Sequence, residues 1–223
     1  MYIILLNTCL IFGSFCVIDR ILDSFSSLQG IYYGIHSIHN IIIVYLTTHE
    51  VYNTITQFDK IFTMPKNELA LEFVFALHFY HLAIYWKKFR FDDWLHHLLM
   101  IGIALPIGTL VDSKSLMGYS LFFTTGLPGA IDYFLLFLVR NNWLNRKKEK
   151  LINSYLNVWI RSPGCISHAF LTFIFVFLTT QKYSMDWFCG IIVGLLTFWN
   201  GQYFMRQVVE NNILIQQPNI VFY

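Results

Sequence analysis

Long apolar stretches alternate with short polar connections along the whole chain. A helix needs about 20 apolar residues to cross the ~30 Å hydrocarbon core of a bilayer. Seven stretches are long enough, and the connections between them are too short to hold a separate soluble domain. The pattern predicts an all-α, multi-pass transmembrane helical bundle of about seven spans, at residues 1–18, 30–48, 68–86, 94–111, 115–139, 163–180 and 186–205.

Composition supports the same class. Hydrophobic residues make up 56% of the 223 residues and charged residues only 13%, with a mean hydropathy of +0.53. A soluble domain carries about twice that share of charge. The net charge of +2 is too small, and no basic block is long enough, to indicate a nucleic-acid partner.

The first span lacks the basic start and the small-residue cleavage site of a signal peptide. We therefore expect an N-terminal membrane anchor at residues 1–28, a core at 29–206 and a short cytosolic tail at 207–223.

Lysine and arginine are unevenly divided between the two predicted faces. Because cytosolic connections carry an excess of these residues, their distribution predicts a luminal N-terminus and a cytosolic C-terminus. The predicted luminal side holds Lys60, Lys66, Lys114 and Lys182, and the predicted cytosolic side holds Arg20, Lys87, Lys88, Arg90, Arg140, Arg146, Lys147, Lys148, Lys150, Arg161 and Arg206.

Seven of the eight histidines fall in one layer near the predicted cytosolic face; His49 is the exception. At ~1.5 Å of rise per residue, five of them lie ~8–14 Å in from that face. Ionisable residues inside a membrane usually face the bundle interior and mark functional sites. The predicted layer comprises His36, His39, His78, His81, His96, His97 and His168, with Asp132 and Asn200 at a similar level.

The histidine spacing does not complete the HxxxH and HxxHH boxes typical of di-iron lipid hydroxylases and desaturases. Three imidazoles and a water would suit catalytic zinc, but nothing in the spacing selects that metal. Acid–base or nucleophilic chemistry without a metal or other cofactor is the third alternative, because imidazole titrates near neutral pH. We expect no metal site.

Three local motifs accompany the histidines. Asp93 is placed to cap the helix that carries His96 and His97, with orientation of that pair as its alternative role. The TTGLPG stretch at 124–129, which includes Thr125, predicts a proline kink serving either helix packing or a substrate cavity. The RSPG stretch at 161–164 predicts a helix start, with Arg161 at headgroup level.

Two stretches resemble the TLC-domain membrane proteins, a family that includes ceramide synthases and translocon-associated membrane proteins. The first is HSIH at 36–39. The second is FYHLAIYWKKFRFDDWLHH at 79–97, in which Asp93 precedes the histidine pair by three and four residues. The HD-x-x-D pattern of ceramide synthases is absent from FTTGLPG at 123–129, where Asp132 is the nearest acidic residue.

This resemblance implies a TLC-like six-helix core and an endoplasmic reticulum protein that handles an acyl lipid in a polar cavity near the cytosolic face. If the protein is an enzyme, the resemblance implies lipid acyl transfer of ceramide-synthase type, with acyl-CoA as co-substrate and membrane lipids or a second copy of the chain as partners. We expect His96 or His97 to act as base or nucleophile, assisted by Asp132 or His81. We expect the cavity to be lined by His36, His39, His78, Asp93, Thr125, His168 and Asn200. The alternatives are a non-enzymatic lipid regulator or cargo receptor and, less favoured, a histidine-box hydroxylase.

Overall fold

The computed structural model describes residues 2–25 and 27–217, and their regular structure is entirely helical. The predicted all-α class is therefore confirmed. Short π turns join α5 to α6, α7 to α8 and α9 to α10, so the described chain forms seven long rods and the short helix α3. The helices are α1 (Tyr2–Asp23), α2 (Ile31–Thr56), α3 (Lys60–Thr63), α4 (Glu68–Tyr85), α5 (Phe91–Leu99), α6 (Leu105–Leu110), α7 (Leu116–Leu121), α8 (Leu127–Arg140), α9 (Arg146–Leu156), α10 (Ser162–Thr179) and α11 (Met185–Gln216).

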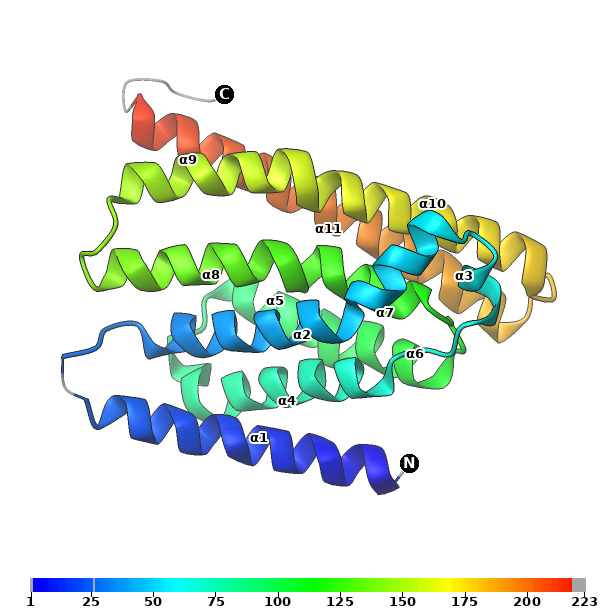
Figure 1. The fold of residues 1–223 in the computed structure, drawn as a ribbon, viewed down its shortest axis with the longest axis horizontal. Helices are drawn as coiled ribbons and strands as arrows, with labels where there is room; N and C mark the ends of the chain where they lie inside the picture. The colour runs from blue at the N-terminus through cyan, green and yellow to red at the C-terminus, as the bar shows by residue number, and fades with distance from the viewer. Residues whose placement is uncertain (1, 26, 218–223) are drawn as a thin grey trace.

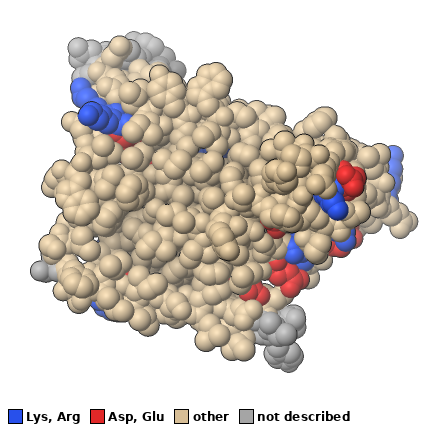
Figure 2. Space-filling view, viewed as in Figure 1, with Lys and Arg blue, Asp and Glu red and all other residues tan. Residues whose placement is uncertain are grey.

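Six of these rods, within the described part of the chain, are long and apolar enough to cross a membrane. Large side chains such as Leu10, Phe170 and Leu178 are exposed on them, as expected for surfaces that face lipid. Figure 2 shows charged side chains gathered toward the two ends of one face, with a wide, almost uncharged band between them. These features support a multi-pass membrane protein.

The rod outside this set is α2, and its position explains its polarity. Figure 1 shows α2 running along the middle of the bundle, between α8 and α4, with α1 on the far side of α4. Neighbouring helices thus cover one face of α2, and that face can carry polar side chains toward the interior, while Ile41, Tyr45 and Ile55 on the opposite face are exposed. The buried polar side chains are His36, Ser37, His39, Asn40, Thr47, Glu50, Asn53 and Thr54.

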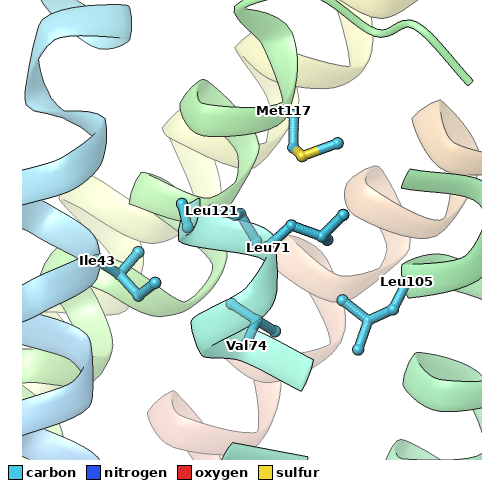
Figure 3. Packing of buried hydrophobic residues seen from close by; sticks show 7 residues of the cluster. Ile43, Leu71, Val74, Leu105, Met117 and Leu121 are labelled. Carbon is cyan, nitrogen blue, oxygen red and sulfur yellow. The ribbon is translucent and has the colours of Figure 1, made fainter. Parts of the chain in front are cut away.

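Buried apolar side chains join α2 to three other rods. Figure 3 shows Ile43 of α2 facing a group of leucine, valine and methionine side chains from α4, α6 and α7. This cluster fixes the half of the bundle that lies away from most of the histidines. Its buried members are Ile43, Ala70, Leu71, Val74, Leu105, Met117 and Leu121.

Each of the three π turns ends two residues before a proline. The turns are Met100–Ala104, Phe122–Gly126 and Asn157–Arg161, and the prolines are Pro106, Pro128 and Pro163. Proline has no N–H, so the carbonyl four residues earlier loses its usual partner, and a wider turn accommodates the loss. At Pro128, where the sequence predicts a kink, the structure shows one of these π turns.

The expected helix start at RSPG is wrong. Pro163 lies inside one helical rod that runs from Arg146 to Thr179, so no new helix begins at Ser162 and Arg161 is in the middle of that rod. The segment before it is polar, but its buried polar residues Glu149, Asn153 and Asn157 are four residues apart and share one helix face. They contact neighbouring helices, so the helix continues. The last rod likewise extends beyond residue 205, to Gln216.

Helix α1 packs along α4 and is pinned there by polar contacts. The Tyr80 and Tyr85 hydroxyls each donate to the Asp19 carboxylate at 2.7 Å. Toward the other end, the Asn7 amide donates to the Glu72 carboxylate at 3.1 Å. The first span is therefore an integral part of the bundle. Its start and the end of α11 lie at opposite ends of the molecule (Figure 1).

Candidate functional site

Six histidines from three helices form one cluster. They lie as i, i+3 pairs on α2 (His36, His39) and α4 (His78, His81) and as neighbours in the last turn of α5 (His96, His97). The His36 and His81 ring centroids are 4.5 Å apart, and the His97 ring lies 5.3 Å from His78 and 5.5 Å from His81. The structure thus brings together six of the seven histidines predicted to share a layer.

Two imidazole pairs connect α4 to α5. His78 Nε2 lies 3.3 Å from His96 Nε2, and His81 Nδ1 lies 3.3 Å from His97 Nε2. Helix α5 makes its extensive contacts within its own rod, which packs on α4 mainly through α6. The imidazole pairs are therefore the principal polar link between α5 and the rest of the bundle.

Backbone carbonyls set the proton positions in these pairs, because a carbonyl can only accept. His78 Nδ1 donates to the Val74 carbonyl at 2.7 Å, so the Nε2 of neutral His78 accepts from His96 Nε2–H. The Nδ1 of neutral His96 consequently keeps a free lone pair. On the other pair, His97 Nδ1 donates to the Asp93 carbonyl at 2.7 Å, so His97 Nε2 accepts from His81. Both nitrogens of His97 are occupied.

Accessibility separates the two members of the histidine pair further. His97 is only 4% exposed, whereas His96 is exposed. Exposed apolar side chains flank His96, with Leu98 68% and Trp94 45% exposed. The cluster therefore presents one imidazole, with a free nitrogen, to a surface suited to lipid chains.

Other predicted site residues lie at the edge of this cluster. Thr125 Oγ1 donates to the Asn40 amide oxygen at 3.0 Å, and the same oxygen accepts from His39 Nδ1 at 2.9 Å. The carboxylate of Asp93 accepts from the Arg90 backbone N–H at 2.9 Å, which confirms its predicted capping role. Its backbone carbonyl, and not its side chain, orients His97.

Three predicted residues lie outside the cluster. His168 contacts Thr172 on its own helix, at 3.2 Å, and Tyr119 of α7. The Asn200 amide oxygen accepts from Arg161 at 3.0 Å. Asp132, on α8, has a buried carboxylate oxygen with no hydrogen-bond partner and lies near the charged groups of Glu149, Lys150 and Arg161.

Two residues that contribute to the site were not predicted from the sequence. Tyr133 stacks flat on His36, with ring centroids 3.7 Å apart and an interplanar angle of 5°. Arg161 lies within electrostatic range of both His96 and Tyr133. Tyr133 could have been predicted as a site residue, because it directly follows Asp132 in the sequence. Arg161 was not recognised as a site residue because the sequence predicted a helix start at this position.

Two surface hollows on the described structure lie away from the histidines. One is lined by Phe62, Lys114 and Asp186, and the other by residues of the turn between α8 and α9. The expected polar cavity therefore stays a prediction, and His96 at the surface of α5 is the point of access that the structure shows.

Within the described residues, no group of three or more histidine, cysteine or acidic side chains is arranged to hold a metal ion. Both histidine boxes of a di-iron site are also incomplete. We therefore expect elemental analysis of the purified protein to find no stoichiometric iron. Two irons per chain would favour the hydroxylase alternative instead.

Comparison with known protein families, curated proteins and solved structures finds no match to this chain. The geometry of the histidine cluster therefore carries the functional argument.

Proposed function

We propose that this protein handles an acyl lipid in the membrane and transfers the acyl group to an amine or hydroxyl, with His96 as the reacting base or nucleophile. One observation carries this proposal: the exposed His96 has a free Nδ1, while its Nε2 bonds to the buried His78. A side chain oriented by a second buried group is the arrangement that activates catalytic histidines.

The two imidazoles can share a proton during the reaction. When His96 Nδ1 takes a proton from the acceptor, or attacks an acyl carbonyl, positive charge develops on its ring. Its Nε2–H can then move toward His78 Nε2, and the Val74 carbonyl holds His78 in the orientation that accepts it. His78 therefore acts as the positioning residue for His96, in place of the expected His81, which is paired with His97.

The basic and apolar side chains near His96 suit acyl-CoA as the acyl donor. His96 follows Arg90 by six residues, or ~9 Å of helix, and Lys87 and Lys88 precede it in the same connection. These cations can bind the phosphates of coenzyme A at the membrane surface while the thioester reaches His96. The exposed Leu95, Leu98 and Ile103 continue along the rod as a surface for the acyl chain.

The TLC-like motif around Asp93, His96 and His97 supports the same proposal and an endoplasmic reticulum location. Lipidomics of cells that express the wild type or His96→Ala/His97→Ala tests it, with Leu110→Ala, an exposed position at the other end of the same rod, as the control. The proposal expects a lipid change that requires the histidines. Equal lipid profiles for the wild type and the double variant would favour a non-enzymatic regulator or cargo receptor.

The proposed orientation places the basic connections after α1, α4 and α8 in the cytosol, with the N-terminus in the lumen. The predicted cytosolic side carries eleven basic residues against four on the other side. In sealed microsomes, we expect protease to remove a C-terminal tag and to spare an N-terminal tag. Protection of the C-terminal tag would reverse the orientation and place His96 near the luminal face.

A further inference from the structure

An arginine with no carboxylate in ion-pair contact lies midway along the helical rod Arg146–Thr179, next to its apolar stretch. Arg161 ends the π turn Asn157–Arg161, ~22 Å along the rod from Arg146 at the usual helical rise. Arginine stays protonated in proteins, and charged side chains in membranes normally pair with an opposite charge. Across the residues that the structure places, no carboxylate oxygen lies within 4.0 Å of the Arg161 guanidinium.

Helix α11 holds this guanidinium in a fixed position. Nη2 donates to the Asn200 amide oxygen at 3.0 Å, and the guanidinium carbon lies 4.4 Å from the Phe204 ring centroid. Both contacts involve uncharged groups, so they orient the cation without neutralising it. Nε is buried and has no hydrogen-bond partner, which leaves a donor for an additional acceptor.

Arg161 also lies within electrostatic range of groups on two other rods. These groups are His96 of α5 and Tyr133 of α8. The nearest acidic residue, Asp132, also keeps a buried oxygen without a donor. Asp132 and Arg161 therefore lie within electrostatic range of each other but do not form an ion pair within 4.0 Å.

We propose that Arg161 binds the anionic group, a phosphate or a carboxylate, of a single-chain lipid whose amine or hydroxyl reacts at His96. The planar guanidinium matches both anions, and the positioning by Asn200 and Phe204 prepares it for this role. This inference rests on the proposed function for the identity of the lipid as acyl acceptor. The anionic site itself can be tested without turnover.

The test measures binding of three lipids to the purified protein in phosphatidylcholine nanodiscs. Lysophosphatidate with an oleoyl chain carries a phosphate, oleate carries a carboxylate, and monoolein has the same chain length with no charge. We expect the wild type to bind at least one of the two anions about tenfold more tightly than monoolein. The tighter of the two identifies the anionic group.

Arg161→Gln should abolish this preference, and Asn200→Ala should weaken it about threefold because the cation remains but loses its positioning contact. Arg206→Gln is the matched control, because Arg206 is exposed and pairs with Glu210, so its binding should change less than about twofold. If Arg161→Gln does not fold, Asn200→Ala decides the matter.

Retention of the preference in folded Arg161→Gln, or in Asn200→Ala if Arg161→Gln does not fold, would overturn this inference, as would a wild type that binds monoolein as tightly as the anions. His96→Ala should keep the anionic preference. An intact preference in a wild type that shows no acyl transfer would refute the proposed function and leave the anionic site standing.

Discussion

Replacing His96 with alanine is expected to lower acyl transfer by about 100-fold or more, while the protein accumulates to its normal level. General acid–base catalysis by one positioned histidine contributes about that much. The apolar side chains of the rod, such as Leu95 and Leu98, supply the energy of insertion. One hydrogen bond lost inside the bundle costs on the order of 1 kcal/mol, which is too little to unfold it.

The companion variant His97→Ala should have a smaller effect on the rate. His97 is buried, and both of its nitrogens are occupied by Asp93 and His81, so it supports the cluster and does not meet the substrate. Product formation per unit of folded protein, measured for both variants, checks this order. A larger loss in His97→Ala would assign the reaction to the other member of the pair.

Replacing Gly164 with leucine is expected to destabilise the bundle by about 1–3 kcal/mol or more. A Cβ atom at this position would lie 2.2 Å from two ring atoms of Phe123 and 2.6 Å from its Cβ. Phe123 belongs to the π turn before Pro128, so it cannot move without disturbing that rod. Thermal unfolding of the detergent-purified protein measures the loss.

Gly13→Leu is the matched control. No atom lies within 4 Å of a Cβ built at Gly13, so the added side chain should be accommodated at the surface of α1. Equal melting temperatures for the two variants would show that the close approach of α10 to the α7–α8 rod is not needed for stability.

Most of the fold could be predicted from the sequence, because the length of each apolar stretch determines which segments can form membrane-spanning helices. Residues 68–86 and 115–139 were predicted within one residue of the rods Glu68–Tyr85 and Leu116–Arg140. A π turn also precedes Pro128, the position at which a kink was predicted. A run of apolar residues bounded by charges allows few alternatives in a bilayer.

Failures occurred where tertiary contacts override local polarity. The polar segment Arg146–Leu156 is helical because its buried face meets α8 and α11, and Pro163 continues the helix because a π turn precedes it. No pattern in the local sequence predicts these helix contacts or the π turn. The histidine layer was predicted from depth alone, but depth could not tell that His78, and not His81, pairs with His96. That choice depends on helix rotation and packing.

Release of coenzyme A from palmitoyl-CoA tests the central claim most directly. The wild type and His96→Ala would be compared in nanodiscs that contain a total lipid extract from the expressing cells, with thiol release followed over time. The account predicts steady release by the wild type and a rate about 100-fold lower for folded His96→Ala. Equal rates for the two proteins, or no release by the wild type, would contradict it.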